Sequence, residues 1–160
     1  MTASRQVDLR SKTKLETLQM VENLPADLRA HVSEAWLQSI RELQFDDPWH
    51  LGFAIVLRAD CRRIGQCGFK GPPVDQAVEI AYQVDENEQG KGYATEAVGL
   101  LVEHAFSSEE VRQILAHTLP ESNASTRVLE KNGFAFVSDV QDPEDGLIWC
   151  WQLQQTASTR

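Results

Sequence analysis

The sequence has few cysteines, an excess of acidic over basic residues, and no long apolar run. Its three cysteines, Cys61, Cys67 and Cys150, form no C-x-x-C pair, which argues against a disulfide framework and a zinc knuckle. With 15 Lys and Arg against 24 Asp and Glu, the net charge of -9 argues against a nucleic-acid-binding surface. No window is apolar enough to span a bilayer, and the N-terminus does not resemble a secretory signal. A cytoplasmic protein with neither membrane nor nucleic acid as partner is expected.

Metal-ligand spacing and nucleotide-binding motifs are also missing. The four histidines, His31, His50, His104 and His117, share no ligand spacing with each other or with the cysteines, so no metal is expected. A P-loop occurs nowhere. The dinucleotide fingerprint G-x-G-x-x-G fails at Thr95, where its third glycine should stand. Sites for ATP or NAD therefore lack support.

The chain is long enough for one domain with a sizeable core. It has 160 residues, of which 42% are hydrophobic, and a single domain over residues 1–160 is expected. The first 13 residues are polar and are expected to be loosely ordered.

Periodicity predicts an α+β domain around one central sheet. Strands are predicted at Leu15–Val21, Phe53–Asp60, Arg62–Gly71, Ala77–Val84, Gln113–Leu119, Phe134–Val140 and Leu147–Leu153. Helices are predicted at Ala26–Leu43, Gly92–Ser108 and Ser122–Gly133, the last with Ser122 or Asn123 as its N-cap. A turn is predicted at Asp142–Gly146.

The stretch QGKGYATEA (Gln89–Ala97) stands between a predicted strand and a predicted helix. Gly90 and Gly92 allow the backbone to approach a ligand closely, and the free N–H groups of the helix's first turn favour an anion. A pyrophosphate would fit there, with Lys91 adding attraction. The alternative is that the glycines only permit a tight turn.

The order and spacing of three segments decide how this stretch is interpreted. From Gln89, QGKGYA fits Q/R-x-x-G-x-G/A; it follows the strand EIAYQV, and LPESNASTRVLEKNGF comes beyond the next strand. Together these segments resemble the GNAT superfamily of N-acetyltransferases, especially the branch that acetylates ribosomal-protein N-termini. The resemblance covers Phe53 to about Leu153. It implies a mostly antiparallel twisted sheet of six to seven strands flanked by helices.

The resemblance also implies a site for acetyl-CoA as co-substrate. In that family the pyrophosphate binds backbone N–H groups of the loop and of the helix start, which here means Gln89, Gly90, Lys91, Gly92, Tyr93, Ala94 and Thr95. The pantetheine arm pairs with the strand near Val84, in a V-shaped opening toward the strand Gln113–Leu119. Ser122, Asn123 and Ser125 would lie near the far end of the arm. Arg127 and Lys131 would meet a CoA phosphate or be ordinary surface charges.

Catalytic roles follow from the resemblance with one departure. Glu79 is the candidate general base; alternatively it is a solvent-facing acid in an alternating strand. A strand N–H near Val84 is the expected oxyanion donor. Many relatives use a tyrosine as general acid, but Leu129 stands at that position, so Ser125 is the candidate substitute, with N-capping as the alternative. Glu96 is assigned no catalytic role, because an acid stabilises a first helical turn.

We expect direct acetyl transfer from acetyl-CoA to a primary amine in a ternary complex. The α-amine of a protein N-terminus is favoured by the branch resemblance. The alternatives are a small-molecule amine, such as an amino acid, polyamine or antibiotic, and a non-catalytic acyl-CoA-binding module. The oligomeric state is expected to be a monomer or a homodimer.

Overall fold

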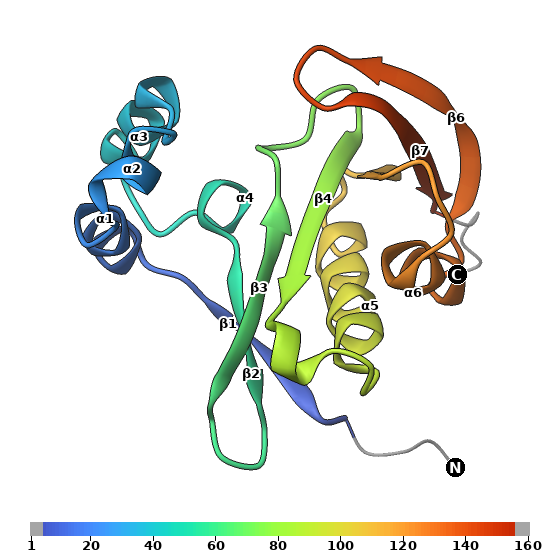
Figure 1. The fold of residues 1–160 in the computed structure, drawn as a ribbon, viewed down its shortest axis with the longest axis horizontal. Coiled ribbons are helices and arrows are strands. Elements are labelled where there is room, and N and C mark those ends of the chain that lie inside the picture. The colour runs from blue at the N-terminus through green and yellow to red at the C-terminus, as the bar shows by residue number, and fades with distance from the viewer. Residues whose placement is uncertain (1–4, 156–160) are drawn as a thin grey trace.

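Seven strands form one sheet in the computed structural model, which describes residues 5–155 (Figure 1). The strands are β1 (Val7–Ser11), β2 (Phe53–Leu57), β3 (Arg63–Phe69), β4 (Ala77–Val84), β5 (Gln113–Thr118), β6 (Ala135–Asp142) and β7 (Gly146–Gln154). The helices are α1 (Lys14–Glu22), α2 (Ala26–Arg29), α3 (Glu34–Arg41), α4 (Pro48–Leu51), the short 3-10 helix η1 (Glu86–Glu88), α5 (Tyr93–Phe106) and α6 (Ala124–Lys131).

The strand order is β1-β2-β3-β4-β5-β7-β6, and every neighbouring pair is antiparallel except β4–β5. The parallel pair is joined by α5, which packs on β1, β3 and β4 and also contacts α6. The predicted fold class, α+β with a mostly antiparallel sheet of six to seven strands flanked by helices, is confirmed.

The core lies between the sheet and α5. Alternation places Val78, Ile80 and Val84 of β4 on the buried face, as their period of two predicts. Leu101 of α5 and Ile114 of β5 are fully buried against them. The middle of the chain therefore folds as its local patterns indicate.

Two predictions in the N-terminal third are wrong. The predicted strand Leu15–Val21 is the helix α1, which begins with a capping box in which Thr13 accepts from Glu16 N and the Glu16 carboxylate accepts from Thr13 N. The predicted helix Ala26–Leu43 is broken into α2 and α3. Ser33 starts α3 afresh, because its hydroxyl accepts from Trp36 N and caps the new helix.

The polar N-terminal segment is more ordered than predicted. Residues 1–4 lie outside the described residues, but Val7–Ser11 form β1 and pair with β2. The Glu96 carboxylate of α5 accepts from Gln6 N at 2.6 Å and from Val7 N at 2.9 Å. This bridge from a distant helix explains why the sequence around β1 gave no signal of order.

Candidate active site

An opening forms where β4 and β5 separate. Their pairing ends at Glu79↔Leu115, while β4 stays paired with β3 through Val84. Lys70 N donates to Glu79 O and Asp85 N donates to Ile64 O, so odd-numbered residues of β4 bond to β3. The main-chain groups of Tyr82 and Val84 therefore face away from β3, toward the opening. A V-shaped gap at this place is what the resemblance to the GNAT superfamily implied.

A cavity of about 410 Å³, here called the β4–α6 cavity, occupies this opening. Its lining residues are Tyr82, Gln83, Val84, Glu88, Gln89, Gly90, Gly92, Tyr93, Ala94, Thr95, Ala124, Ser125, Arg127, Val128 and Lys131. Most of the residues predicted to bind a cofactor are thus brought together here. In Figure 1, α5 lies beside β4 and α6 lies next to α5.

The glycine loop has the geometry of an anion site. Gly90 and Gly92 have φ of 81° and 86°, and a Cβ on either would meet no atom within 4 Å. Gly92 is the N-cap of α5 and provides no side-chain cap, which leaves the first N–H groups of the helix open. The carboxylate of Glu96 is turned to β1 instead. The positive end of α5 therefore faces the cavity without a local anion from its own first turn.

Lys91 and Asn123 were predicted at this site, and neither lines the cavity. Lys91 Nζ lies 3.1 Å from Glu88 Oε1, and Glu88 also binds Arg62 at 2.7 Å. Hydrogen bonds from Arg62 and Lys91 hold the pKa of Glu88 below its usual value. Asn123 Oδ1 accepts from Thr126 N at 3.1 Å, so this side chain is the N-cap of α6.

Two cations of α6 also line the β4–α6 cavity. Arg127 and Lys131 are one helical turn apart and face the same space as the glycine loop. A ligand with several phosphates could meet the α5 N-terminus and these side chains together.

Glu79 lies on β4 where the pairing with β5 ends. Its Oε2 is 2.7 Å from His117 Nδ1 and 3.0 Å from Lys70 Nζ. Glu79 does not line the β4–α6 cavity. It is a carboxylate held by two partners at the edge of the opening, and it is not freely solvated.

Tyr82 is a residue that the sequence analysis overlooked. Its hydroxyl donates to the main-chain oxygen of Ser125 at 3.1 Å, and burial raises the pKa of Tyr82 to about 12. The phenol reaches the start of α6 from the strand β4. Tyr82 and Ser125 are 43 residues apart in the sequence, so only the fold reveals this contact.

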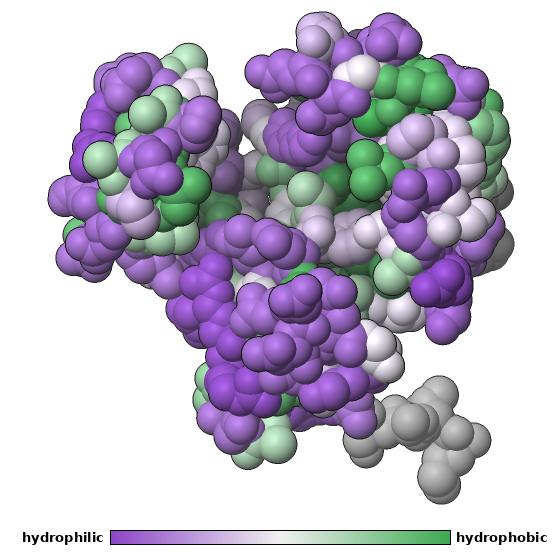
Figure 2. Space-filling model, in the orientation of Figure 1, coloured by the Kyte–Doolittle hydropathy of each residue, from purple (hydrophilic) through white to green (hydrophobic). Residues whose placement is uncertain are grey.

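A second cavity, of about 470 Å³, lies on the other side of Tyr82 and is here called the α1–β3 cavity. It is lined by Lys12, Thr17, Met20, Trp36, His50, Leu51, Gly52, Gln66, Cys67, Gly68, Phe69, Ala81, Tyr82 and Gln83. Figure 2 shows the surface hollowed between α1–α3 and the rest of the molecule. Tyr82 and Gln83 line both cavities, which therefore adjoin.

Residues far apart in sequence form the walls of the α1–β3 cavity. Cys67 is buried, which raises the pKa of its thiol to about 12, so it acts as a small apolar wall residue. His50 lines the cavity with its Nδ1 2.9 Å from Asp47 Oδ2. Lys12, Trp36 and His50 were not predicted as site residues, because their own neighbourhoods carry no motif.

Within residues 5–155, no group of three or more His, Cys, Asp and Glu side chains is arranged to hold a metal ion. Across the same range, no helix combines the length and apolarity that crossing a membrane requires.

The separated parallel strands, the glycine loop and the helix behind it define a GNAT-type fold and site. The chain belongs to the acetyltransferase (GNAT) domain family, whose profile matches residues 8–135. The superfamily resemblance seen from Phe53 onward is thus confirmed, and it extends toward the N-terminus as far as β1.

A probable N-acetyltransferase of Bacillus subtilis, YjcK, is 38% identical over 96 residues, which are 58% of this chain and 51% of that protein. The chain spans about half the length of the curated relatives it matches. The ribosomal-protein-S5-alanine acetyltransferase of Vibrio fischeri has a TM-score of 0.70 at 16% identity, covering 99% of this chain and 98% of that one. The aminoglycoside acetyltransferase AAC(6')-Ib, in complex with coenzyme A, has a TM-score of 0.67 at 22% identity, covering 94% and 96%. These two likenesses establish the fold.

Proposed function

We propose that this chain is an acetyl-CoA-dependent N-acetyltransferase, working as a single domain. The acetyl group would pass directly to a primary amine while both substrates are bound. The observation that carries the proposal is the pair of adjoining cavities, which share Tyr82 and Gln83. One has the features of an anion site, and the other opens beside it on the same strand.

Acetyl-CoA fits the residues of the β4–α6 cavity. The open space beside Gly90 and Gly92 and the uncapped start of α5 suit a pyrophosphate. Arg127 and Lys131 suit a further phosphate. The main-chain groups of β4 near Val84 suit the amide groups of a pantetheine arm; in this structure Val84 O accepts from Gln89 Nε2 at 2.9 Å. When bound, acetyl-CoA supplies an activated acetyl thioester.

A base is needed because an ammonium group cannot attack a thioester. We assign this role to Glu79 acting with His117, a pair that can hold a proton at Oε2 or Nδ1. A weak base is enough to deprotonate a protein N-terminus, because its α-amine has a pKa of about 7.7 to 8.0, compared with about 10.4 for lysine. The similarity to ribosomal-protein acetyltransferases supports the same acceptor.

Tyr82 is our candidate donor for the leaving thiolate, with Ser125 beside it. Leu129, at the position of the family's usual tyrosine, is fully buried in the core and bears no donor. Tyr82 supplies a hydroxyl from another element, and this hydroxyl stays protonated at neutral pH because its pKa is about 12. The main-chain N–H of Val84 is the candidate oxyanion donor.

The test is release of the CoA thiol from acetyl-CoA by the purified chain. Acceptors would be N-terminal peptides, lysine peptides, polyamines and aminoglycosides, with CoA binding measured by calorimetry. Amine-dependent release with one class is the expected result, and Glu79→Gln should slow it. CoA binding without release from any acceptor would instead indicate a non-catalytic acyl-CoA-binding module, as the loss of tyrosine at Leu129 would permit.

A further inference from the structure

We infer that the acceptor amine of this protein also carries a carboxylate, which binds Lys12 in the α1–β3 cavity. The inference rests on the proposed function, and it selects among the acceptors that the function leaves open. It favours acidic N-terminal peptides or acidic amino acids over polyamines and aminoglycosides.

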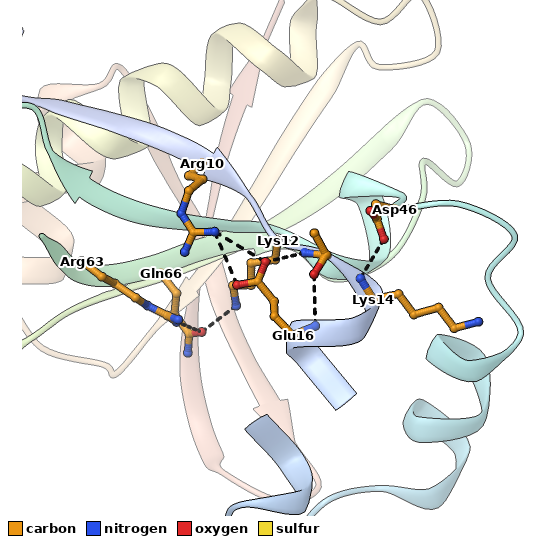
Figure 3. Close-up of polar contacts among 8 residues, drawn as sticks. Arg10, Lys12, Lys14, Glu16, Asp46, Arg63 and Gln66 are labelled. Atoms are coloured by element: carbon orange, nitrogen blue, oxygen red, sulfur yellow. Dashed lines mark hydrogen bonds and ion pairs between the residues drawn. The ribbon is translucent and has the colours of Figure 1, made fainter. Parts of the chain in front are cut away.

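Lys12 is a half-buried cation without a carboxylate partner in the cavity wall. Its Nζ donates to Gln66 Oε1 at 2.7 Å, and Arg63 Nη2 donates to the same oxygen at 3.2 Å (Figure 3). Gln66 is neutral, so two positive charges share one amide oxygen. Such an arrangement leaves an unsatisfied demand for negative charge.

The nearest charges add to this demand. Burial lowers the pKa of Lys12, and the neighbouring Arg63 lowers it further. Glu16 is the nearby carboxylate, but it accepts from Thr13 N at 2.7 Å and lies 3.5 Å from Arg10 (Figure 3). The positive charges near Lys12 therefore outnumber the negative ones. There are three cations, Arg10, Lys12 and Arg63, and one carboxylate, Glu16, which already has partners.

The lining of the α1–β3 cavity, as far as the structure describes it, carries no negative charge that could bind a second ammonium group. Of the described residues, no Asp or Glu lines the α1–β3 cavity. A second ammonium on the acceptor would therefore find Lys12 and no counter-charge. A carboxylate there would gain a charge-assisted hydrogen bond from Lys12.

The remaining wall suits a compact organic acceptor. Trp36 and Met20 offer partly exposed apolar surface from the helices facing the sheet. The hydroxyl of Thr17 is buried and has no hydrogen-bond partner among the described residues.

The local charge is opposite in sign to that of the whole chain. A net charge of -9 repels an anionic acceptor at long range. Screening confines that repulsion to about 8 Å at physiological salt, whereas Lys12 acts at contact distance. Selection for a carboxylate would therefore arise inside the cavity.

The experiment compares kcat/KM for matched acceptors. Peptides with Asp or Glu at the second position would be set against Asn, Gln and Lys at that position, and free glutamate against free glutamine. We expect the acidic member of each pair to be preferred by about tenfold or more. The peptide and amino-acid arms distinguish the two possible sources of the carboxylate.

Variants then assign the preference to Lys12. Lys12→Gln should bring the acidic-to-neutral ratio close to 1, and Lys12→Arg should retain most of it. Arg58→Gln removes the same charge from an exposed ion pair with Asp8 and should leave the ratio unchanged. Thermal melts would confirm that each variant folds. Equal preference for acidic and neutral acceptors, or a ratio unchanged by Lys12→Gln, would overturn the inference.

Binding separates this inference from the proposed function. Calorimetry would measure the same peptides on the CoA-loaded protein. If acidic peptides bind in a Lys12-dependent way but no thiol is released, the proposed acetyltransferase activity is contradicted and the proposed carboxylate site is supported. Thiol release that is strongest with cationic or neutral amines would support the acetyltransferase activity and contradict the carboxylate site at Lys12.

Discussion

Gly90 and Gly92 determine the backbone shape of the loop that faces the β4–α6 cavity. Both have positive φ, which costs other residues about 1–2 kcal/mol. Nothing within 4 Å would oppose a methyl group at either position, so the space beside them is free for a ligand. Glycine at these two positions therefore does two things: it allows the positive φ of the loop, and it lets a ligand come close to the backbone.

Gly92→Ala should weaken CoA binding about tenfold, because its methyl group would enter the space assigned to the pyrophosphate. The measurement is the Kd for CoA by calorimetry. Gly146→Ala is the matched control, since Gly146 also has positive φ and free space but is the first residue of β7, outside both cavities. An unchanged Kd in folded Gly92→Ala protein would leave the loop as a plain turn.

Tyr82→Phe should lower kcat by about 10²-fold with little change in the KM for acetyl-CoA, because it removes a donor and keeps the ring. Steady-state kinetics measures both values, and Ser125→Ala is the comparison. If only the serine variant lost activity, Ser125 would be the donor and Tyr82 a wall residue.

The raised pKa of Tyr82 also predicts how the rate of acetyl transfer depends on pH. Burial raises its pKa to about 12, so the protonated form persists from neutral pH to about pH 10. The wild-type rate with a saturating acceptor should therefore show no loss of a general acid between about pH 8 and pH 10. A fall in rate over that range, absent in Tyr82→Phe, would contradict a pKa this high.

The strand β4 has two different partners along its length, and this difference makes the site. Next to β3 it is paired through Val84, while next to β5 it is paired only through Glu79. Gly65 allows β3 and β4 to approach closely, because a Cβ at this position would overlap the main-chain oxygen of Gln83. The β5 side is left open for a ligand.

The helix α5 also holds β1 in place through Glu96. Glu96→Ala should lower the free energy of unfolding by about 1–2 kcal/mol, since the main-chain N–H groups of Gln6 and Val7 lose their acceptor. Urea unfolding would measure the change. Glu103→Ala, on an exposed part of the same helix, is the control. Equal effects of the two variants would mean that the bridge contributes nothing specific.

The molecule as a whole is acidic, whereas the β4–α6 cavity is lined by two cations, Arg127 and Lys131, beside one acid, Glu88, and the α1–β3 cavity is lined by Lys12 and, within residues 5–155, by no acid. Attraction for an anionic ligand must therefore be local, from the α5 N-terminus with Arg127 and Lys131 in one cavity and from Lys12 in the other.

The double variant Arg127→Gln with Lys131→Gln should raise the Kd for CoA by about 2- to 30-fold, because each exposed charge contributes about 0.2–1 kcal/mol and every 1.4 kcal/mol is tenfold. The control, Arg29→Gln with Arg58→Gln, changes the net charge equally at surface positions outside both cavities. Equal weakening in both double variants would assign the effect to net charge rather than to the cavity.

The sequence determined the segment from β2 to β7, including the glycine loop, because alternation, glycine punctuation and helix caps are set by neighbours in the chain. The pattern of apolar residues predicted a strand where α1 lies and one continuous helix where α2 and α3 lie, because short windows there fit more than one pattern. The caps at Thr13 and Ser33 set the actual helix starts.

Only the tertiary structure decided which side chains meet at the two cavities. Lys12 and Gln66 are 54 residues apart, and Tyr82 and Ser125 are 43 apart. The splaying of β4 from β5 and the packing of α1–α3 bring such residues together. No local pattern encodes these contacts, because they depend on how whole elements pack against one another.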